Sequence, residues 1–366
     1  MHNSREPWLR VAKRDGMSFP KRLAVRLGAV LISLLVCGIV IYAITGINPV
    51  EVYSTMVSGA FGTRTRLWST LKEAALLSCI AIGLAPAFKM RFWNIGAEGQ
   101  VLIGGMITAG CMIYLSALPA WLLFLCMFAG SVVAGAIWGL LPAVFKAKWN
   151  TNETLFTLMM NYVAIQLTSF FVAKWENPYG SNTVGIINQQ GQEGWFPMIF
   201  STRYFISLVL VLVLSVLMFI YLKYTKHGYE ISVVGASENT ARYAGMQVGK
   251  VTIRTMLLSG GICGLAGFMA VAGASHTISV STAGGKGFTA IIVAWLAKFN
   301  SFTMLLISLL LAFLEGGAKE IASKCKLNDY ASQMVTGIIL FFILGSEFFI
   351  NYRLVFRKSE KEGSGK

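Results

Sequence analysis

The segment Phe92-Trp93-Asn94-Ile95-Gly96-Ala97-Glu98-Gly99-Gln100 joins two long apolar segments, residues 67–88 and 97–116. It places a carboxylate, two side-chain amides and two glycines where a lipid-facing helix would carry hydrocarbon side chains. Polar groups at membrane depth are costly unless they are paired or line a water-filled cavity. The segment therefore indicates a path through a membrane bundle rather than its lipid-facing wall.

Composition and length favour a protein that crosses the membrane many times. Of its 366 residues, 55% are hydrophobic and 13% are charged, whereas soluble domains carry about 25% charged residues. We predict an all-α, polytopic membrane helix bundle with about ten transmembrane segments. The predicted segments are residues 23–45, 67–88, 97–116, 119–145, 153–173, 204–222, 252–273, 287–297, 302–318 and 331–350.

The eighth predicted segment is too short to cross a bilayer alone. We expect it to join the glycine-rich residues before it in a broken helix near residues 276–297. Irregular backbone is tolerated at that depth only where protein or water covers it.

The basic residues predict the orientation. With the N-terminus in the cytoplasm, 22 of the 31 lysines and arginines fall in cytoplasmic segments, 8 fall outside and Lys72 falls within a span. This bias favours both termini in the cytoplasm. Residues 1–22 then form a basic leader, residues 23–350 one transmembrane domain and residues 351–366 a tail.

The sequence gives little support to a nucleic-acid site, a metal site, a disulfide framework or a cofactor site. The net charge of +15 comes from residues at segment ends, and no basic face with interleaved aromatics indicates nucleic-acid binding. The six cysteines form no Cys-x-x-Cys pair and the three histidines are far apart. We therefore predict no metal site, no disulfide framework and no cofactor.

Glu98 has two candidate roles. It caps the helix of residues 97–116, where the helix dipole favours a carboxylate, lines the path with Asn94 and Gln100, or does both. Asn161 lies deeper in a later span, where its amide needs a partner. An interhelical hydrogen bond and contact with a substrate are both open for Asn161.

Residues 283–291 read Ala-Gly-Gly-Lys-Gly-Phe-Thr-Ala-Ile. A phosphate-binding P-loop needs a glycine five residues before the Gly-Lys pair and a serine or threonine after it. Those positions hold Val280 and Gly287, so the pattern fails. We expect instead a broken helix whose free N-terminal amides face the path.

The inner loop of residues 223–250 is the longest predicted cytoplasmic loop. Ser237 fits an N-cap, and Gly245 fits a C-terminal stop about two turns later. So short a helix is marginal alone and needs its own membrane domain or a partner to pack on. Further along, Gly260 and Gly264 have the GxxxG spacing that lets helices approach closely. We predict internal packing there, and a dimer seam stays open.

Several motifs follow the order found in one family. They occupy residues 94–100, 152–153, 160–162, 228–230, 241–245, 258–267 and 284–291. On these motifs the chain, over about residues 70–300, resembles the permease subunits of bacterial ABC importers for nucleosides and simple sugars. That family is related to the ribose and branched-chain amino-acid permeases. Glu73 and Glu315 are acids that depart from its usual pattern.

The resemblance implies a multi-pass permease of the bacterial inner membrane that performs no covalent chemistry. Its implied partners are cytoplasmic ATP-binding cassette subunits, a second permease subunit, an extracytoplasmic substrate-binding (lipo)protein and membrane lipid. The expected path residues are Asn94, Glu98, Gln100, Asn161, Gly284, Gly287 and Phe288. The expected ATPase-coupling residues are Ser237, Glu238, Asn239, Arg242, Tyr243 and Gly245.

Two other functions remain as alternatives. An ion-coupled secondary transporter would need acidic residues in the membrane, and Glu73, Glu98 and Glu315 are candidates. An intramembrane enzyme finds less support, because the chain contains neither an HExxH nor a GxSxG motif.

Overall fold

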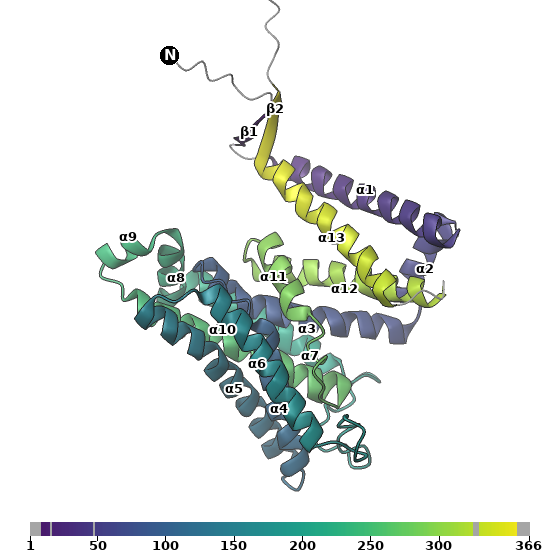
Figure 1. Ribbon diagram of the computed structural model, residues 1–366, viewed down its shortest axis with the longest axis vertical. Coiled ribbons are helices and arrows are strands. Elements are labelled where there is room, and N and C mark those ends of the chain that lie inside the picture. Colours follow the sequence, from purple (N-terminus) through teal and green to yellow (C-terminus); the bar gives the residue numbers. More distant parts are fainter. Residues whose placement is uncertain (1–8, 15–16, 47, 325–328, 357–366) are drawn as a thin grey trace, which may run out of the picture. The chain divides into compact units, whose positions relative to one another are not determined.

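The computed structural model describes residues 9–14, 17–46, 48–324 and 329–356. The chain divides into two compact units, which we call the core unit (residues 61–313) and the terminal unit (residues 1–60 and 314–366). Apart from one pair of strands, the regular structure in the described residues is helical, as predicted (Figure 1).

The core unit contains all the predicted path and coupling residues. Its elements are α3 (Arg64–Lys89), α4 (Ala97–Tyr114), α5 (Ala120–Trp149), α6 (Glu153–Lys174), α7 (Phe205–Tyr224), α8 (Lys226–Ala236), α9 (Glu238–Tyr243), α10 (Val248–Ala270), the π-helical turn η1 (Val271–Ser275), α11 (Lys286–Leu296) and the first part of α12 (Ser301–Lys324).

The terminal unit combines the two ends of the chain. Its elements are β1 (Leu9–Lys13), α1 (Phe19–Thr45), α2 (Pro49–Phe61), the last part of α12, α13 (Asp329–Asn351) and β2 (Tyr352–Phe356). Helix α1 packs against α13, where the Cys37 thiol contacts the Val335 carbonyl oxygen at 3.7 Å.

Strands β1 and β2 lie within the predicted leader and tail, whose boundaries stay a prediction. They pair antiparallel from Leu9 with Phe356 to Lys13 with Tyr352. Neither strand could be found by a search for long apolar spans, because each is short and gains its hydrogen bonds only from the other. The predicted tail beyond residue 356 lies outside the described residues, as do His2 and Cys325.

Each of the ten predicted spans corresponds to a helix, but the number of crossings stays a prediction. Seven helices in the described residues are long and apolar enough to cross a membrane. They are α3, α5, α6, α7, α10 with η1, α12, and α13 from Met334. Helix α11 has only 11 residues, which at about 1.5 Å per residue cannot span a hydrocarbon layer of about 30 Å.

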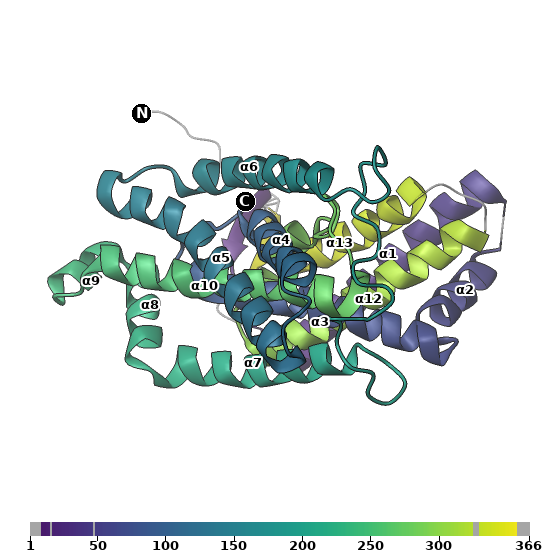
Figure 2. The same cartoon turned by 90° about the horizontal axis from the view of Figure 1, so that it is seen from below.

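Helix α10 is the centre of the core unit and packs against α3, α4 and α5. Figure 2 shows it between α6 on one side and α7 on the other. Its glycines touch neighbouring backbone: a Cβ added at Gly260, Gly264 or Gly267 would lie within 3.0 Å of a main-chain atom of α4 or α5. The GxxxG spacing therefore serves internal packing, as predicted.

We expect Gly264→Ala to destabilise the core unit. The added methyl group would clash with the Ser131 carbonyl oxygen, and neither backbone can move without disturbing a helix. Overpacking of this kind costs about 1–3 kcal/mol. Thermal unfolding of the purified chain in detergent measures the effect.

The matched control is Gly28→Ala in α1, where nothing lies within 4 Å of the added Cβ. A melting temperature for Gly264→Ala equal to that of the control would contradict this packing.

Candidate functional site

Glu98, in the first turn of α4, holds the N-terminus of α11. Its Oε1 accepts a hydrogen bond from the Gly285 N–H at 2.7 Å, and its Oε2 accepts one from the Gly287 N–H at 2.8 Å. Glu98 is 7% exposed. Charge-assisted hydrogen bonds and the helix dipole both favour a carboxylate here. Glu98 thus acts as a cap, but of α11 rather than of its own helix.

Glycines make this contact sterically feasible. Gly285 has a φ of +76° in the left-handed region, which residues with a Cβ rarely adopt. At Gly287 a Cβ would come within 3.0 Å of the Glu98 backbone. The prediction of free amides at this helix start is wrong, because the amides of Gly285 and Gly287 are bonded to Glu98. A buried N–H without a partner would carry a desolvation cost.

Asn94 and Gln100 form a buried amide network. The Asn94 Nδ2 donates to the Gln100 Oε1 and to the Ser259 Oγ of α10, both at 3.2 Å. The Asn94 Oδ1 accepts from the Gly96 N–H at 3.1 Å. Both amide side chains are at most 1% exposed. They fasten the segment before α4 to α10, and neither faces an open space.

Asn161 joins α6 to the start of α4. Its Oδ1 accepts from the Gly99 N–H at 2.9 Å, and its Nδ2 donates to the Ile95 carbonyl at 2.9 Å. Of the two roles open for Asn161, the structure contains the interhelical hydrogen bond. We call this assembly of residues the Glu98 junction; its members are Asn94, Glu98, Gln100, Asn161, Ser259, Gly285 and Gly287.

The structure thus brings the predicted path residues together, with differing exposure. Asn94, Gln100 and Asn161 are buried, whereas Phe288 at the start of α11 is 45% exposed. Gly284 lies in the loop just before α11 and has a φ of +60°. Among these residues, Phe288 alone offers a large side chain for contact with another molecule.

A second carboxylate at the start of α11 was not predicted. Glu73 of α3 pairs with Lys286 at 3.2 Å and with Lys72 at 3.0 Å. The adjacent charges Lys72-Glu73 within an apolar segment were the available signal, because charges in such a position are expected to be paired. Helix α11 is therefore attached at its N-terminus to both α3 and α4.

Two exposed tryptophan rings meet where the segment before α4 contacts α11. The Trp93 and Trp295 rings stack with centroids 5.5 Å apart, and the Phe88 ring lies 5.9 Å from that of Trp93. Trp93 and Trp295 are 44% and 43% exposed. Together with Phe288 we call Trp93 and Trp295 the aromatic face. Trp93 and Trp295 lie far apart in the chain, so the sequence alone does not predict that their rings stack.

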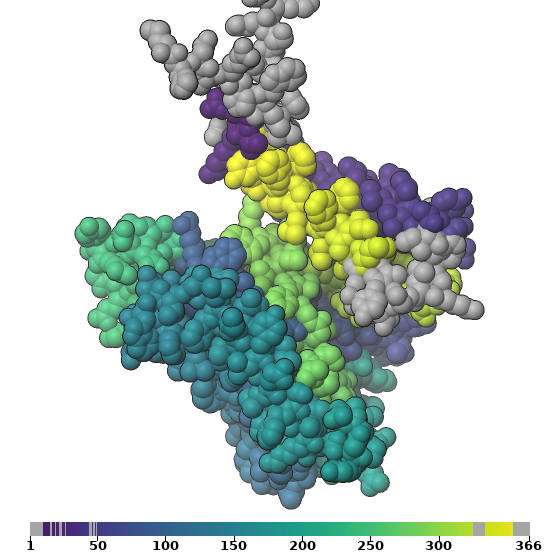
Figure 3. Space-filling model, in the orientation of Figure 1, coloured from purple at the N-terminus to yellow at the C-terminus, as the bar shows by residue number. Residues whose placement is uncertain are grey.

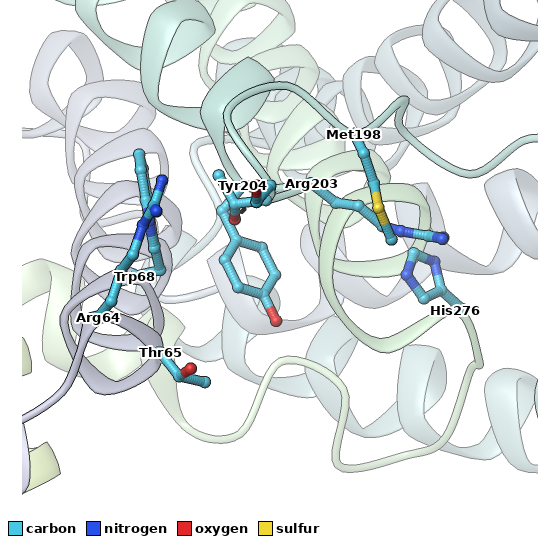
Figure 4. Close-up of a pocket in the computed structure, with 9 residues that line it drawn as sticks. Arg64, Thr65, Trp68, Met198, Arg203, Tyr204 and His276 are labelled. Atoms are coloured by element: carbon cyan, nitrogen blue, oxygen red, sulfur yellow. Dashed lines mark hydrogen bonds between the residues drawn. The ribbon is translucent and has the colours of Figure 1, made fainter.

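A cavity of about 420 Å³ lies between α3 and the loop of residues 175–204, and sequence analysis missed it (Figure 4). It is lined by Arg64, Thr65, Trp68, Met198, Ser201, Thr202, Arg203, Tyr204 and His276. We call it the arginine cavity. Figure 4 shows the Arg203 guanidinium beside the His276 ring, with Tyr204 between them and Trp68.

An aromatic stack borders the arginine cavity. The Trp195 and His276 rings are nearly parallel, with centroids 3.9 Å apart, and the Arg203 guanidinium lies 4.5 Å from the Trp195 ring centre. Burial, and secondly the charge of Arg203, lower the pKa of His276 to about 4. The imidazole is therefore neutral at pH 7, which suits stacking next to a cation.

The predicted helix in the inner loop is present as α9. The Ser237 Oγ accepts from the Thr240 N–H at 3.2 Å, and Gly245 has a φ of +77°. Arg242 forms an ion pair with Glu238 at 3.8 Å, and both side chains are more than half exposed. Tyr243 is 92% exposed.

Helix α8, which the sequence did not predict, joins α9 to the bundle. A Cβ at Gly228 would lie within 3.0 Å of the Tyr221 carbonyl, and one at Gly235 within 3.0 Å of the Lys89 carbonyl. Helix α8 therefore packs directly on the ends of α7 and α3. Figures 1 and 3 show α8 and α9 at the end of the core unit opposite the loop of residues 175–204.

Comparison with known proteins identifies the family. Residues 67–344 match the family of permease components of branched-chain amino acid transport systems. This chain belongs to that family. It is accordingly a multi-pass membrane transport subunit of an ABC transporter and not an enzyme, and family membership implies ATPase and binding-protein partners.

Several named relatives are similar over most of their length. A guanosine ABC transporter permease of Bacillus subtilis is 27% identical, and the match covers 93% of this chain and 98% of the relative. A glucose ABC transporter permease of Haloferax volcanii is 29% identical, covering 89% and 88%. A nucleoside ABC transporter permease of Lactococcus lactis is 25% identical, covering 88% and 91%.

We expect Glu98→Gln to loosen the start of α11 and reduce uptake. Glutamine has one acceptor oxygen in place of two and turns an N–H₂ group toward an amide, so a buried donor is left unbonded at a cost of about 1–3 kcal/mol. Hydrogen exchange of the Gly285 and Gly287 amides should become faster, and uptake by cells with the complete transporter should fall.

Glu153→Gln is the control, because Glu153 also lies in the first turn of its helix and pairs with Lys146 at 3.0 Å. Unchanged exchange at Gly285 and Gly287 in the Glu98 variant would show that the carboxylate does not hold α11.

Proposed function

We propose that this permease forms the translocation path of an importer for nucleosides, with simple sugars as the second candidate. The observation that carries this proposal is the aromatic face, whose three rings are each about 43–45% exposed. Every nucleobase has a flat face that can stack on such rings, with about 1–3 kcal/mol per base. Two of the three named relatives transport nucleosides by their names, and the third transports glucose.

The path in this proposal follows the exposed side of α11. Phe288 and Trp295 lie on that helix, and Trp93 stacks on Trp295 from the segment before α4. The Glu98 junction holds these segments in place, so Asn94, Glu98, Gln100 and Asn161 would position the path rather than contact substrate. A second permease subunit, either a copy or a relative of this chain, would complete the path on the side left open.

The proposed orientation places both termini in the cytoplasm of a bacterial cell, at the inner membrane. The distribution of lysines and arginines supports it. The pairing of β1 with β2 supports it as well, since it brings the two ends of the described chain together. Helices α8 and α9 would then face the cytoplasm and the arginine cavity the outside.

In this orientation α9 would dock on a cytoplasmic ATPase subunit. Arg242 and Tyr243 are exposed at the tip of the inner loop, and Arg and Tyr are residues that frequently anchor interfaces. Ser237, Glu238, Asn239 and Gly245 would shape the helix that presents them. Close packing of α8 on α3 and α7 provides a stiff connection to the bundle.

At the opposite end, the arginine cavity would receive the extracytoplasmic binding protein. Two arginines line it, and the Nη1 of Arg203 is buried without a hydrogen-bond partner in the described residues. A carboxylate from a partner would satisfy that donor.

An ion-coupled transporter finds less support. A mid-membrane ion site needs a carboxylate with free oxygens. Glu98 is bonded to two amides, Glu73 to two lysines, and Glu315 to Lys319 at 2.7 Å.

We expect Trp295→Ala to raise the KM for nucleoside uptake about tenfold, because loss of one stacking partner at about 1.4 kcal/mol corresponds to that factor. Uptake of a labelled nucleoside, with unlabelled nucleoside or glucose as competitor, measures both affinity and substrate class. The control is Trp121→Ala in α5, where the ring is 70% exposed but distant in sequence from the aromatic face. Competition by glucose alone would reject the nucleoside assignment.

We expect replacement of Arg242 and Tyr243 by alanine to uncouple transport. Substrate should no longer stimulate ATP hydrolysis by the complete transporter, and uptake should fail, although the permease still inserts in the membrane. The matched double variant is Arg10→Ala with Tyr42→Ala, which removes one exposed arginine and one exposed tyrosine from the terminal unit. Full substrate-stimulated ATPase activity in the first variant would refute docking through α9.

A further inference from the structure

Three lysines line a second cavity of about 420 Å³ in the core unit. Lys89 ends α3, Lys223 lies in the last turn of α7, and Lys298 lies between α11 and α12. We call this cavity the lysine pocket. It is lined by Lys89, Phe219, Leu222, Lys223, Tyr229, Ser232, Lys298, Phe299, Asn300 and Ser301.

The positive charge of the lysine pocket is not compensated within the described chain. No aspartate or glutamate is among its lining residues. None of its three lysines forms an ion pair with a described residue. Lys89 donates to the Leu222 carbonyl at 3.4 Å, and Lys223 lies over the Phe219 ring at 5.3 Å. Three cations around one cavity favour an anionic occupant.

Ser301 provides an independent indication of a ligand. It is the first residue of α12, lines the pocket and is 1% exposed. Its Oγ is buried and has no hydrogen-bond partner among the described residues. A buried hydroxyl is normally bonded, so an oxygen of a bound molecule would satisfy it.

The surroundings of the lysine pocket are apolar on one side. Phe219, Leu222 and Phe299 form part of its wall. Along α7, Leu217 and Ile220 are 57% and 46% exposed, next to the pocket in sequence. Since α7 is among the helices suited to cross the membrane, hydrocarbon chains would cover that surface. Basic pockets between membrane helices near the cytoplasmic interface are sites for anionic lipid headgroups.

We propose that the lysine pocket binds the headgroup of an anionic phospholipid. The phosphate lies among the lysine ammonium groups and accepts the Ser301 hydroxyl proton in a hydrogen bond, and the acyl chains run along the exposed side of α7. The occupant is a lipid rather than free phosphate because apolar side chains of α7 form part of the pocket wall and further apolar side chains of that helix are exposed. Since α3, α7, α8 and the connection between α11 and α12 all contribute residues, one lipid would hold four segments together.

The experiment uses the purified full-length chain after removal of native lipid in detergent. It is titrated with phosphatidylglycerol or phosphatidylcholine, and bound lipid is counted by native mass spectrometry. We expect phosphatidylglycerol to bind at least about tenfold more tightly than phosphatidylcholine. A parallel titration with inorganic phosphate distinguishes a lipid site from a phosphate site.

Two matched pairs of variants assign the binding to the lysine pocket. Lys223→Gln with Lys298→Gln should lose the preference for phosphatidylglycerol, whereas Lys148→Gln with Lys250→Gln, which removes two exposed lysines elsewhere, should retain it. Ser301→Ala should weaken binding, whereas Ser308→Ala removes another buried, unpartnered hydroxyl of the same helix and should not. Thermal unfolding confirms that all four variants are folded.

Several results would overturn the proposal. Equal binding of the two lipids by the unmodified chain, or equal phosphatidylglycerol binding by both lysine variants, would exclude this headgroup site. Displacement of lipid by inorganic phosphate at equal concentration would assign the pocket to free phosphate. Loss of ATPase-subunit binding in the Lys223 and Lys298 variant, without any change in lipid binding, would assign the pocket to an acidic protein partner.

Discussion

The hydrogen bonds from Gly285 and Gly287 to the Glu98 carboxylate impose the main constraint on the core unit. The buried Glu98 carboxylate and the buried Gly287 amide are each costly alone, and each supplies the partner that the other needs. The contact requires that α4 and α11 begin side by side, which leaves no room for a side chain at Gly287. The neighbouring amides of Asn94, Gln100 and Asn161 fix the same segments to α6 and α10.

The Glu98 junction also depends on the close packing of α10 against α4 and α5. Helix α10 can approach α4 and α5 closely only because glycines stand where the backbones touch. That approach brings Ser259 within 3.2 Å of Asn94. Close packing and the polar network therefore depend on each other: the glycines bring the helices together, and the amide side chains fix their alignment.

Helix α3 contacts both the start of α11 and helix α8. Glu73 pairs with Lys286 at the start of α11, and the Lys89 carbonyl at the other end of α3 packs against Gly235 of α8. If an ATPase subunit docks on α9 as proposed, a displacement of α8 and α9 would reach α11 through α3. The lysine pocket includes Lys89 and Tyr229 of α8, so a lipid bound there would act on the same connection.

The sequence by itself determined the class of protein, the positions of its long apolar helices and most members of the junction, but not α2 or α8. Long apolar segments and capping residues are local signals, and helices form from local hydrogen bonds, so the ten predicted segments and the Ser237 cap could be read directly. The motifs around residues 94–100 and 284–291 likewise marked the residues that the fold brings together. What they bond to was decided only by the tertiary structure: Glu98 caps α11 rather than α4, and the amides predicted to be free are occupied. The Glu73 ion pairs, the arginine cavity, the lysine pocket and the pairing of β1 with β2 also lay beyond sequence reasoning. Each of them joins residues far apart in the chain, and no local pattern specifies which distant groups will meet.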